Sequence, residues 1–208
     1  MPNCRFGYIP GQYLNPSNTG DATVNGIADP VTGQIVPGGS LVLGDYADFT
    51  DSEAKQSSNP SGIQGATLYH GRYQRVVVDS GADATQLVAG RQVYVQSVAK
   101  GPYVVTSYNR ALNSNRAKGV LLISPAVGKY CFIETRGWAW VLMKTPLTNA
   151  TPLVGDVIVA AANGLADDPT QTTQPTYAQV EQMIGIALTL PGASGYCLIE
   201  LFPQVFEG

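Results

Sequence analysis

Charged residues are scarce in this chain of 208 residues, because Asp, Glu, Lys and Arg make up only 13% of it. Its twelve basic residues are scattered among fifteen acidic ones, whereas nucleic-acid-binding proteins concentrate Lys and Arg to neutralise phosphates. No run of about 18 apolar residues occurs, and residues 1–10 lack the basic and apolar regions of a signal peptide. We therefore expect a soluble chain without a secretion signal that binds neither nucleic acid nor membranes.

Cysteine is almost as rare, with only Cys4, Cys131 and Cys197, which lie far apart in the sequence. An odd number without C-x-x-C spacing fits neither a disulfide framework nor a zinc site. Cys131 and Cys197 fall inside apolar strand patterns, where a thiol behaves as a small buried hydrophobe. The cysteines therefore predict folding in a reducing compartment.

Histidine occurs once, at His70, which removes the usual general base from most catalytic arrangements. We expect His70 on the surface or in contact with the N-terminal segment. The chain also lacks the G-x-S-x-G turn of serine hydrolases and a glycine loop followed by Lys-Ser or Lys-Thr. These absences predict a protein that is not an enzyme and holds no cofactor.

Two groups of acidic residues could supply oxygen ligands to a cation. The group near residue 50 comprises Asp45, Asp48, Asp51 and Glu53. It lacks the central glycine and distal glutamate of an EF-hand loop, so a solvated turn is favoured. Asp167 and Asp168 could gather oxygens together with Asp156, but nothing else in their spacing specifies a metal. We predict no metal site in either group.

One motif does suggest catalysis. Asp79-Ser80-Gly81 follows the apolar run 76–78 and resembles the active-site loop of retroviral-type aspartic proteases, in which Asp79 would be the catalytic carboxylate. Two such loops share one proton across a dimer axis. However, no glycine-rich flap follows, and the apolar-apolar-Gly segment 183–185 comes too late for the small protease fold. A strand followed by Asp-Ser-Gly is also an ordinary β-turn, and we favour that interpretation.

Turn-forming residues dominate residues 1–65, which we predict to be an extended, strand-poor N-terminal arm. The arm is too apolar to be simply disordered, so its aromatic side chains need a surface to cover. A neighbouring subunit would supply one. The candidate contact residues of the arm are Phe6, Tyr8, Tyr13, Tyr46 and Phe49.

Strand patterns rich in Val, Ile and aromatic residues follow at short, regular intervals. We predict strands at 73–79, 92–98, 103–108, 120–124, 130–135, 138–144, 156–161, 184–190 and 196–202. Gly- and Pro-containing segments between them predict hairpin connections, among them Arg136-Gly137. Only 175–183 has helical spacing. The prediction is an all-β body over residues 66–208, an antiparallel β-sandwich or barrel.

The most distinctive stretch, 127–142, has a glycine, an aromatic-rich strand, Arg136-Gly137 and a second apolar strand in that order. It resembles the central hairpin of the capsid decoration (cement) proteins of tailed phages. A Gly-Asp step often follows in that family, and 153–159 supplies one. The closing segments, 184–188 and 195–201, resemble the family's ending. The resemblance covers about residues 120–202, whereas the long arm departs from small family members.

The resemblance implies a structural virion protein, made in the host cytoplasm, that binds the assembled major capsid protein lattice from outside and stabilises it. It also implies a homotrimer. Trp138 and Trp140 are then candidate lattice or subunit contacts, although core positions are an equally good interpretation. Because strand side chains alternate, we expect half of the set Tyr130, Phe132, Trp138 and Trp140 to face each side.

Two other functional classes stay open. A phage tail or receptor-binding β protein would expose aromatic rings for sugar stacking, and Trp138 or Tyr196 could serve. The minor alternative is the aspartic protease built on Asp79-Ser80-Gly81. An enzyme would lose peptide cleavage in Asp79→Asn, whereas a decoration protein has no cleavage to lose.

Overall fold

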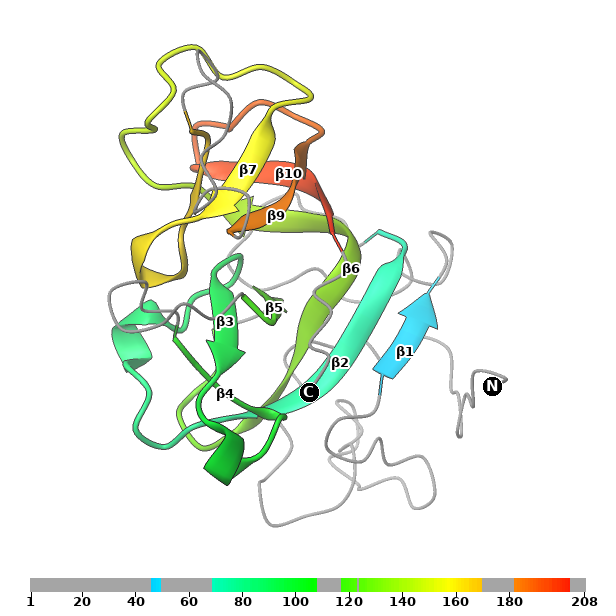
Figure 1. Cartoon of the computed structure of the whole chain (residues 1–208), viewed down its shortest axis with the longest axis vertical. Helices are drawn as coiled ribbons and strands as arrows, with labels where there is room; N and C mark the ends of the chain where they lie inside the picture. Colours follow the sequence, from blue (N-terminus) through cyan, green and yellow to red (C-terminus); the bar gives the residue numbers. More distant parts are fainter. Residues whose placement is uncertain (1–45, 50–68, 108–116, 123, 170–181, 203–208) are drawn as a thin grey trace.

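The computed structural model in Figure 1 describes residues 46–49, 69–107, 117–122, 124–169 and 182–202. These residues form ten strands connected in a single sheet, which confirms the all-β prediction. Helical structure within them consists of three 3-10 turns of three residues each. Across the same ranges, no helix has the length and apolarity needed to cross a membrane.

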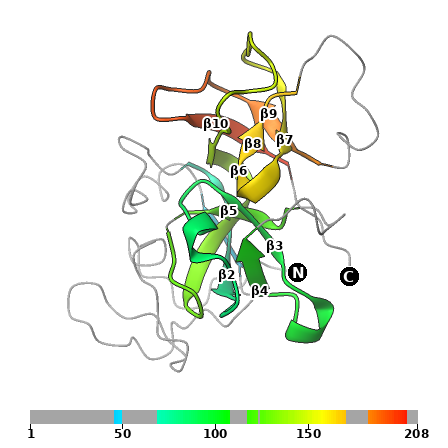
Figure 2. The same ribbon diagram turned by 90° about the vertical axis from the view of Figure 1, so that its left-hand side faces the viewer.

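The strands are, in chain order, β1 (Tyr46–Phe49), β2 (Gly71–Val78), β3 (Gln92–Val95), β4 (Val104–Ser107), β5 (Gly119–Leu121), β6 (Tyr130–Leu142), β7 (Val157–Ala160), β8 (Ala166–Asp167), β9 (Met183–Ala187) and β10 (Tyr196–Leu201). The 3-10 turns are η1 (Ala84–Gln86), η2 (Val98–Lys100) and η3 (Ala162–Gly164). In Figure 2 the strands separate into a lower group, β2 to β5, and an upper group, β7 to β10, with β6 between them.

The lower group closes into a five-stranded ring, the first barrel. β2 pairs with β4, β4 with β3, β3 with β5 and β5 with β6, and β6 returns to β2. The pairing of β2 with β4 is parallel, so the sheet is mixed, whereas the prediction was an antiparallel sandwich or barrel. β4 lies between β2 and β3 in the sheet. It is antiparallel to β3, and its own direction is the same as that of β2.

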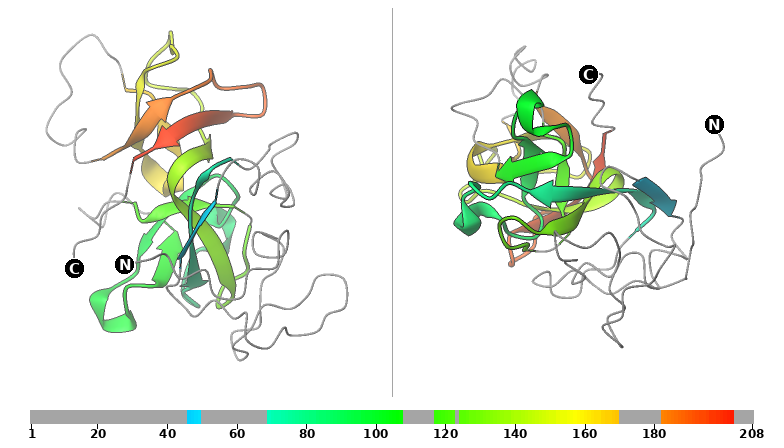
Figure 3. Two further views of the ribbon diagram at one scale, coloured as in Figure 1. Left: turned by 90° about the vertical axis from the view of Figure 1, so that its right-hand side faces the viewer. Right: turned by 90° about the horizontal axis from the view of Figure 1, so that it is seen from below.

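The upper group forms a second ring, the second barrel, from the last part of β6 and from β10, β9, β7 and β8. A bridge between Met143 and Ala166 returns β8 to the end of β6. The Lys144 N–H donates to the Ala166 carbonyl there, over 2.8 Å. Two barrels therefore share the long strand β6, and the left view in Figure 3 shows one barrel above the other.

Gly137 is the point at which β6 leaves one barrel and enters the other. Its Cα is in register with Gly71 of β2 and with Leu201 of β10. Its φ is +111°, and a Cβ there would lie 2.5 Å from the Gly71 Cα and closer still to the His70 carbonyl oxygen. Only glycine fits such a position. The predicted hairpin at Arg136-Gly137 is wrong, because this glycine lets one 13-residue strand change partners without reversing.

Each barrel has its own apolar interior, built by alternate residues of its strands. The first core contains Val76, Val78, Leu87, Val93, Val105, Leu121, Cys131 and Ile133. The second contains Ala139, Val141, Met143, Ile158, Ala160, Ala166, Ile184, Ala187, Cys197, Ile199 and Leu201. Tyr94, Ala117 and Val120 come from the first barrel but belong to the second core. These three side chains pack the two barrels against each other.

Most of the predicted strands are confirmed with slightly shorter bounds, while β1 and the two-residue β8 were not predicted. β1 lies within the predicted arm and pairs antiparallel with the start of β2, with Tyr46 opposite Gln74 and Phe49 opposite Gly71. Figure 3 shows it beside β2. Most of the predicted helix at 175–183 falls outside the described residues, and Met183 begins β9. The proposed division at residue 65 stays a prediction.

Candidate contact surfaces

The arm residues predicted to make contacts lie mostly beyond the part of the chain that the structure describes. Phe6, Tyr8 and Tyr13 are outside it. Tyr46 and Phe49 form the two ends of β1, which places their backbone beside β2. Their role as lattice or subunit contacts therefore stays a prediction.

Trp138 and Trp140 share the outer face of β6, on the side opposite the inward-facing Ala139 and Val141. All four aromatics of this strand occupy even-numbered positions, so simple alternation does not divide them as expected; Phe132 is nevertheless buried, whereas Tyr130, Trp138 and Trp140 are half-buried. Trp138 is half-buried and its ring lies 5.4 Å from that of Tyr69, centroid to centroid. Trp140 packs against a small buried cluster at Tyr196. Both indoles are therefore already engaged within the chain.

His70 lies beside the same surface, where its ring centroid is 5.1 Å from that of Trp138 at an interplanar angle of 54°. The imidazole is half-buried. A tilted contact with Trp138 covers part of the ring, and the predicted contact of His70 with the N-terminal segment stays a prediction. This arrangement gives His70 a packing role.

The most exposed large apolar side chains among the described residues gather at the far end of the second barrel. Leu153 is 65% exposed, Val154 62% and Leu190 53%. The loop before β7 meets the end of β9 where the Gly155 N–H donates to the Ala187 carbonyl over 2.8 Å. Leu190 belongs to the loop between β9 and β10, and Figure 1 draws that loop at the same end of the second barrel. We call Leu153, Val154 and Leu190 the apolar end.

A network of polar groups holds the loop that carries Leu153 and Val154. The Leu153 N–H donates to Asp156 Oδ2 over 2.7 Å. The Asn149 side-chain amide donates to Asp156 Oδ2 over 3.3 Å and to Asp168 Oδ2 over 3.2 Å. Burial, and then the neighbouring Asp156 carboxylate, raise the pKa of Asp168 to about 6. The loop is thus tied to the end of β8 through shared carboxylate oxygens.

Asp167 fastens the start of the same loop. Its carboxylate accepts hydrogen bonds from the Thr148 N–H and hydroxyl, and Lys144 Nζ lies 2.9 Å from its Oδ2. The structure therefore brings Asp156, Asp167 and Asp168 to one place, as their sequence grouping suggested. Within the described ranges, no group of three or more His, Cys, Asp or Glu side chains is arranged to hold a metal ion.

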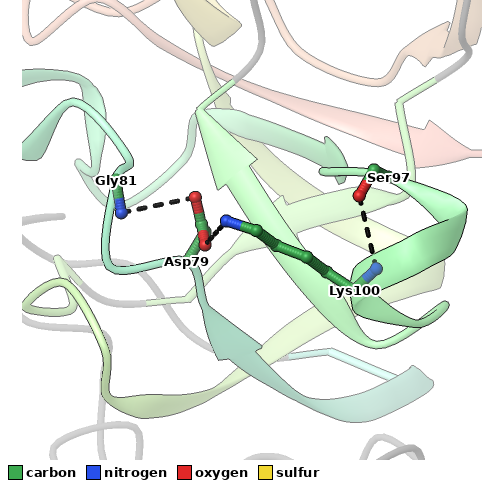
Figure 4. A network of polar contacts seen from close by, with 4 residues as sticks. All are labelled: Asp79, Gly81, Ser97 and Lys100. Atoms are coloured by element: carbon green, nitrogen blue, oxygen red, sulfur yellow. Dashed lines mark hydrogen bonds and ion pairs between the residues drawn. The ribbon is translucent and has the colours of Figure 1, made fainter.

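The Asp79-Ser80-Gly81 motif forms a turn directly after β2. Figure 4 shows the Asp79 carboxylate between the Gly81 N–H, 3.3 Å from Oδ2, and Lys100 Nζ, 2.7 Å from Oδ1. Asp79 is 7% exposed, whereas the Lys100 side chain is 46% exposed. The carboxylate thus joins the turn to the η2 segment. The partner of this carboxylate is a lysine ammonium group, whereas in an aspartic protease the partner is the carboxyl group of a second loop.

The first barrel buries one further acid, Glu134 of β6, which is 2% exposed. Burial raises the pKa of Glu134 well above its ordinary value, and a hydrogen bond with Tyr73 only partly opposes this effect. Gly71 leaves room for this side chain, because a Cβ on that residue would lie 2.6 Å from Glu134 Oε1. The carboxyl is therefore a buried group, enclosed by strands, that holds its proton more strongly than an exposed glutamate does.

Comparisons with known proteins give one partial likeness. No protein-family model matches the chain, and no curated protein matches it. Among solved structures, the head fiber gp8.5 N base of bacteriophage phi29 is similar at 14% identity and a TM-score of 0.41. The alignment covers 65% of this chain and 98% of the phage protein. A likeness of this size assigns neither fold nor function to the chain.

Sequence reasoning did not single out Leu153, Val154 and Leu190 as surface residues. A signal was present, because each is an apolar residue within a segment that contains a turn-forming glycine. Leu and Val in such a segment fit a strand end or a buried loop equally well. Only the three-dimensional position of the loops distinguishes those cases.

Proposed function

We propose that this chain is a structural virion protein, a capsid decoration (cement) protein that binds the assembled major capsid protein lattice from outside and stabilises it. In this proposal the chain is not an enzyme, and it works on the outer capsid surface as a homotrimer. Binding only the assembled shell stabilises that shell by mass action.

The observation that carries the proposal is the apolar end of the second barrel. Three large apolar side chains, each more than half exposed, project from two adjacent loops of a chain that has few charges. Clustered apolar side chains on a protein surface mark sites of contact with other proteins. The segment 190–195 contains no charged residue, which suits close packing on a neighbouring protein.

Two of the three segments that resemble decoration proteins support the proposal. The third, the predicted central hairpin, does not, because its residues form one strand. The other two parts fall on the second barrel: the Gly-Asp step is Gly155-Asp156 at the apolar end, and the closing segments are β9 and β10. The resembling segments and the exposed apolar residues thus belong to the same barrel.

The experiment mixes the purified chain with expanded capsids that lack it, prepared from the phage that encodes it, and measures co-sedimentation. Leu153→Ser with Val154→Ser and, separately, Leu190→Ser should weaken binding at least about tenfold, since each removes buried apolar area from the contact. Val127→Ser is the matched control. Val127 is 37% exposed but lies before β6 on the first barrel, so its variant should bind like the parent chain.

Binding that persists unchanged in both apolar-end variants would contradict the proposed surface, and failure of the parent chain to bind any shell would contradict the proposed function. Retention on immobilised host-surface glycans without capsid binding would instead favour the receptor-binding alternative. Trp138 supports that alternative less well, because Tyr69 and His70 already cover part of its ring.

A further inference from the structure

The loop behind the apolar end is held by two carboxyl groups that share one amide. Asn149 uses its side-chain NH₂ for both Asp156 Oδ2 and Asp168 Oδ2, and its backbone N–H donates to the Asp168 carbonyl over 2.9 Å. The Asn149 side-chain oxygen accepts from the Thr151 N–H over 3.0 Å. One residue therefore connects the loop turn, the start of β7 and the end of β8.

Asp168 is placed badly for an ionised group. It is 1% exposed, and among the described residues its Oδ1 has no hydrogen-bond donor. The carboxylate of Asp156, which shares the Asn149 amide with it, adds a like charge beside it. Two neighbouring carboxylates, one of them buried, cannot both ionise without a cost, whereas one proton between them removes the repulsion.

We propose that Asp156 and Asp168 share a proton, and that uptake of this proton locks the loop carrying Leu153 and Val154 in the conformation described above. The atoms required are present: Asp168 would carry the proton and donate it to Asp156, which keeps an oxygen for the Leu153 N–H. Loss of the proton would separate the carboxylates and loosen the loop. We call this proton-dependent contact between Asp156 and Asp168 the latch. It lies at the same end of the molecule as the proposed capsid contact, but it does not depend on any partner.

The other ionisable groups around the pair are already accounted for. Asp167 adds a negative charge nearby, but Lys144 Nζ neutralises it at 2.9 Å. The Cys197 thiol of β10 is buried, and its pKa is raised, so it stays neutral. No other cation contacts Asp168 in the residues described here, so a proton is the available counter-charge.

The direction of the pH effect follows from the pKa of Asp168, which is about 6 in the folded chain against an ordinary 3.8. The folded chain holds a proton that the unfolded chain releases, so stability falls as pH rises from about 4 to about 6. The latch is closed below about pH 6 and opens above it.

The test is amide hydrogen exchange of the Leu153 N–H in the full chain at pH 5 and pH 8, expressed as protection over the intrinsic rate. Protection should be at least about tenfold lower at pH 8, because the proton is then lost from most molecules. The Val78 N–H, bonded to the Lys129 carbonyl in the first barrel, is the internal reference and should not change.

Asp168→Asn should keep the Leu153 N–H protected at both pH values, because an amide mimics the protonated acid. Glu200→Gln is the matched control, since Glu200 is an exposed carboxylate of the same barrel and its loss should leave the pH effect intact. Equal protection at pH 5 and pH 8 in the parent chain would overturn the proposal, as would an unchanged pH effect in Asp168→Asn.

A second measurement does not depend on any variant folding. The side-chain carboxyl ¹³C shift of Asp168, followed from pH 3 to pH 8, should show a transition near 6, and the Asp156 shift should respond in the same pH range because the two groups are coupled. Titration of Asp168 below about pH 4.5, with no response of the Asp156 shift in the same range, would overturn the latch. Neither readout involves capsids, so failure of the latch is distinguishable from failure of the proposed function.

Discussion

The two barrels share a strand, but they are closed in different ways. The first is a complete ring of strand pairs around a core of Val, Leu and Ile side chains. Among the described residues, the second is completed by the bridge between Met143 and Ala166, and five of the residues in its core are alanines. The second barrel also carries the apolar end and the carboxyl pair. The first barrel thus provides a rigid framework, whereas the second presents exposed loops that a few polar contacts hold in position.

The junction between the barrels should be the most sensitive position. Gly137→Ala should cost at least about 4 kcal/mol, because a Cβ would overlap the backbone of the β2 segment and the positive φ would be strained. Urea denaturation measures the loss. Gly101→Ala is the control, since Gly101 has φ +99° with no atom near its Cβ position, and should cost only about 1 kcal/mol.

Core truncations should show whether the barrels unfold together. Ile133 and Ile199 are both fully buried, one in each core. Each Ile→Ala change should cost about 2–5 kcal/mol. Because Tyr94 and Val120 of the first barrel pack in the second core, both variants should shift one common calorimetric transition. Two separate transitions, each moved by only one variant, would contradict a single cooperative unit.

Glu134, the buried acid of the first barrel, should make the folded chain less stable as pH rises, whereas a paired carboxylate makes it more stable. The pKa of Glu134 is raised on folding, so Glu134 lowers stability as pH rises above its unfolded value of 4.5. Glu134→Gln should therefore be more stable than the parent chain at pH 8 and no more stable at pH 4. Thermal unfolding at the two pH values measures this. A variant that is less stable at pH 8 would show that the ionised form has a partner.

The Asp79–Lys100 pair should have the smallest effect. Its Lys100 side chain is 46% exposed, so Asp79→Asn should cost only about 1 kcal/mol. Lys100→Met and the double variant complete a cycle that isolates the ion pair. Capsid binding should be unaffected. Peptide cleavage by the parent chain that disappears in Asp79→Asn would instead establish the protease alternative.

Strand positions could be predicted from the sequence because the spacing of apolar residues in each strand shows which side faces a core. The partner change at Gly137 could not, since Arg136-Gly137 has the local features of a hairpin turn. Its true role appears only where β2, β6 and β10 meet. β8 has two residues, too few for a periodic pattern.

The candidate site was predictable only in part. The sequence suggested that Asp156, Asp167 and Asp168 lie together, because all three are acidic. It did not predict that two of them would share a hydrogen-bond donor. The link between them is Asn149, whose sequence separation of 19 residues from Asp168 gives no local signal. Trp138 and Trp140 could be placed on one face from their spacing of two residues, whereas the burial of Phe132 on the same strand could not be predicted.

Capsid binding tests the central claim most directly. Expanded capsids and procapsids that lack the protein would be mixed with the parent chain, the Leu153→Ser/Val154→Ser variant, the Val127→Ser control and a chain without residues 2–60. The account predicts that the parent and control chains co-sediment with expanded capsids and that the apolar-end variant and the shortened chain do so much more weakly. Absence of parent-chain binding to either shell would contradict it.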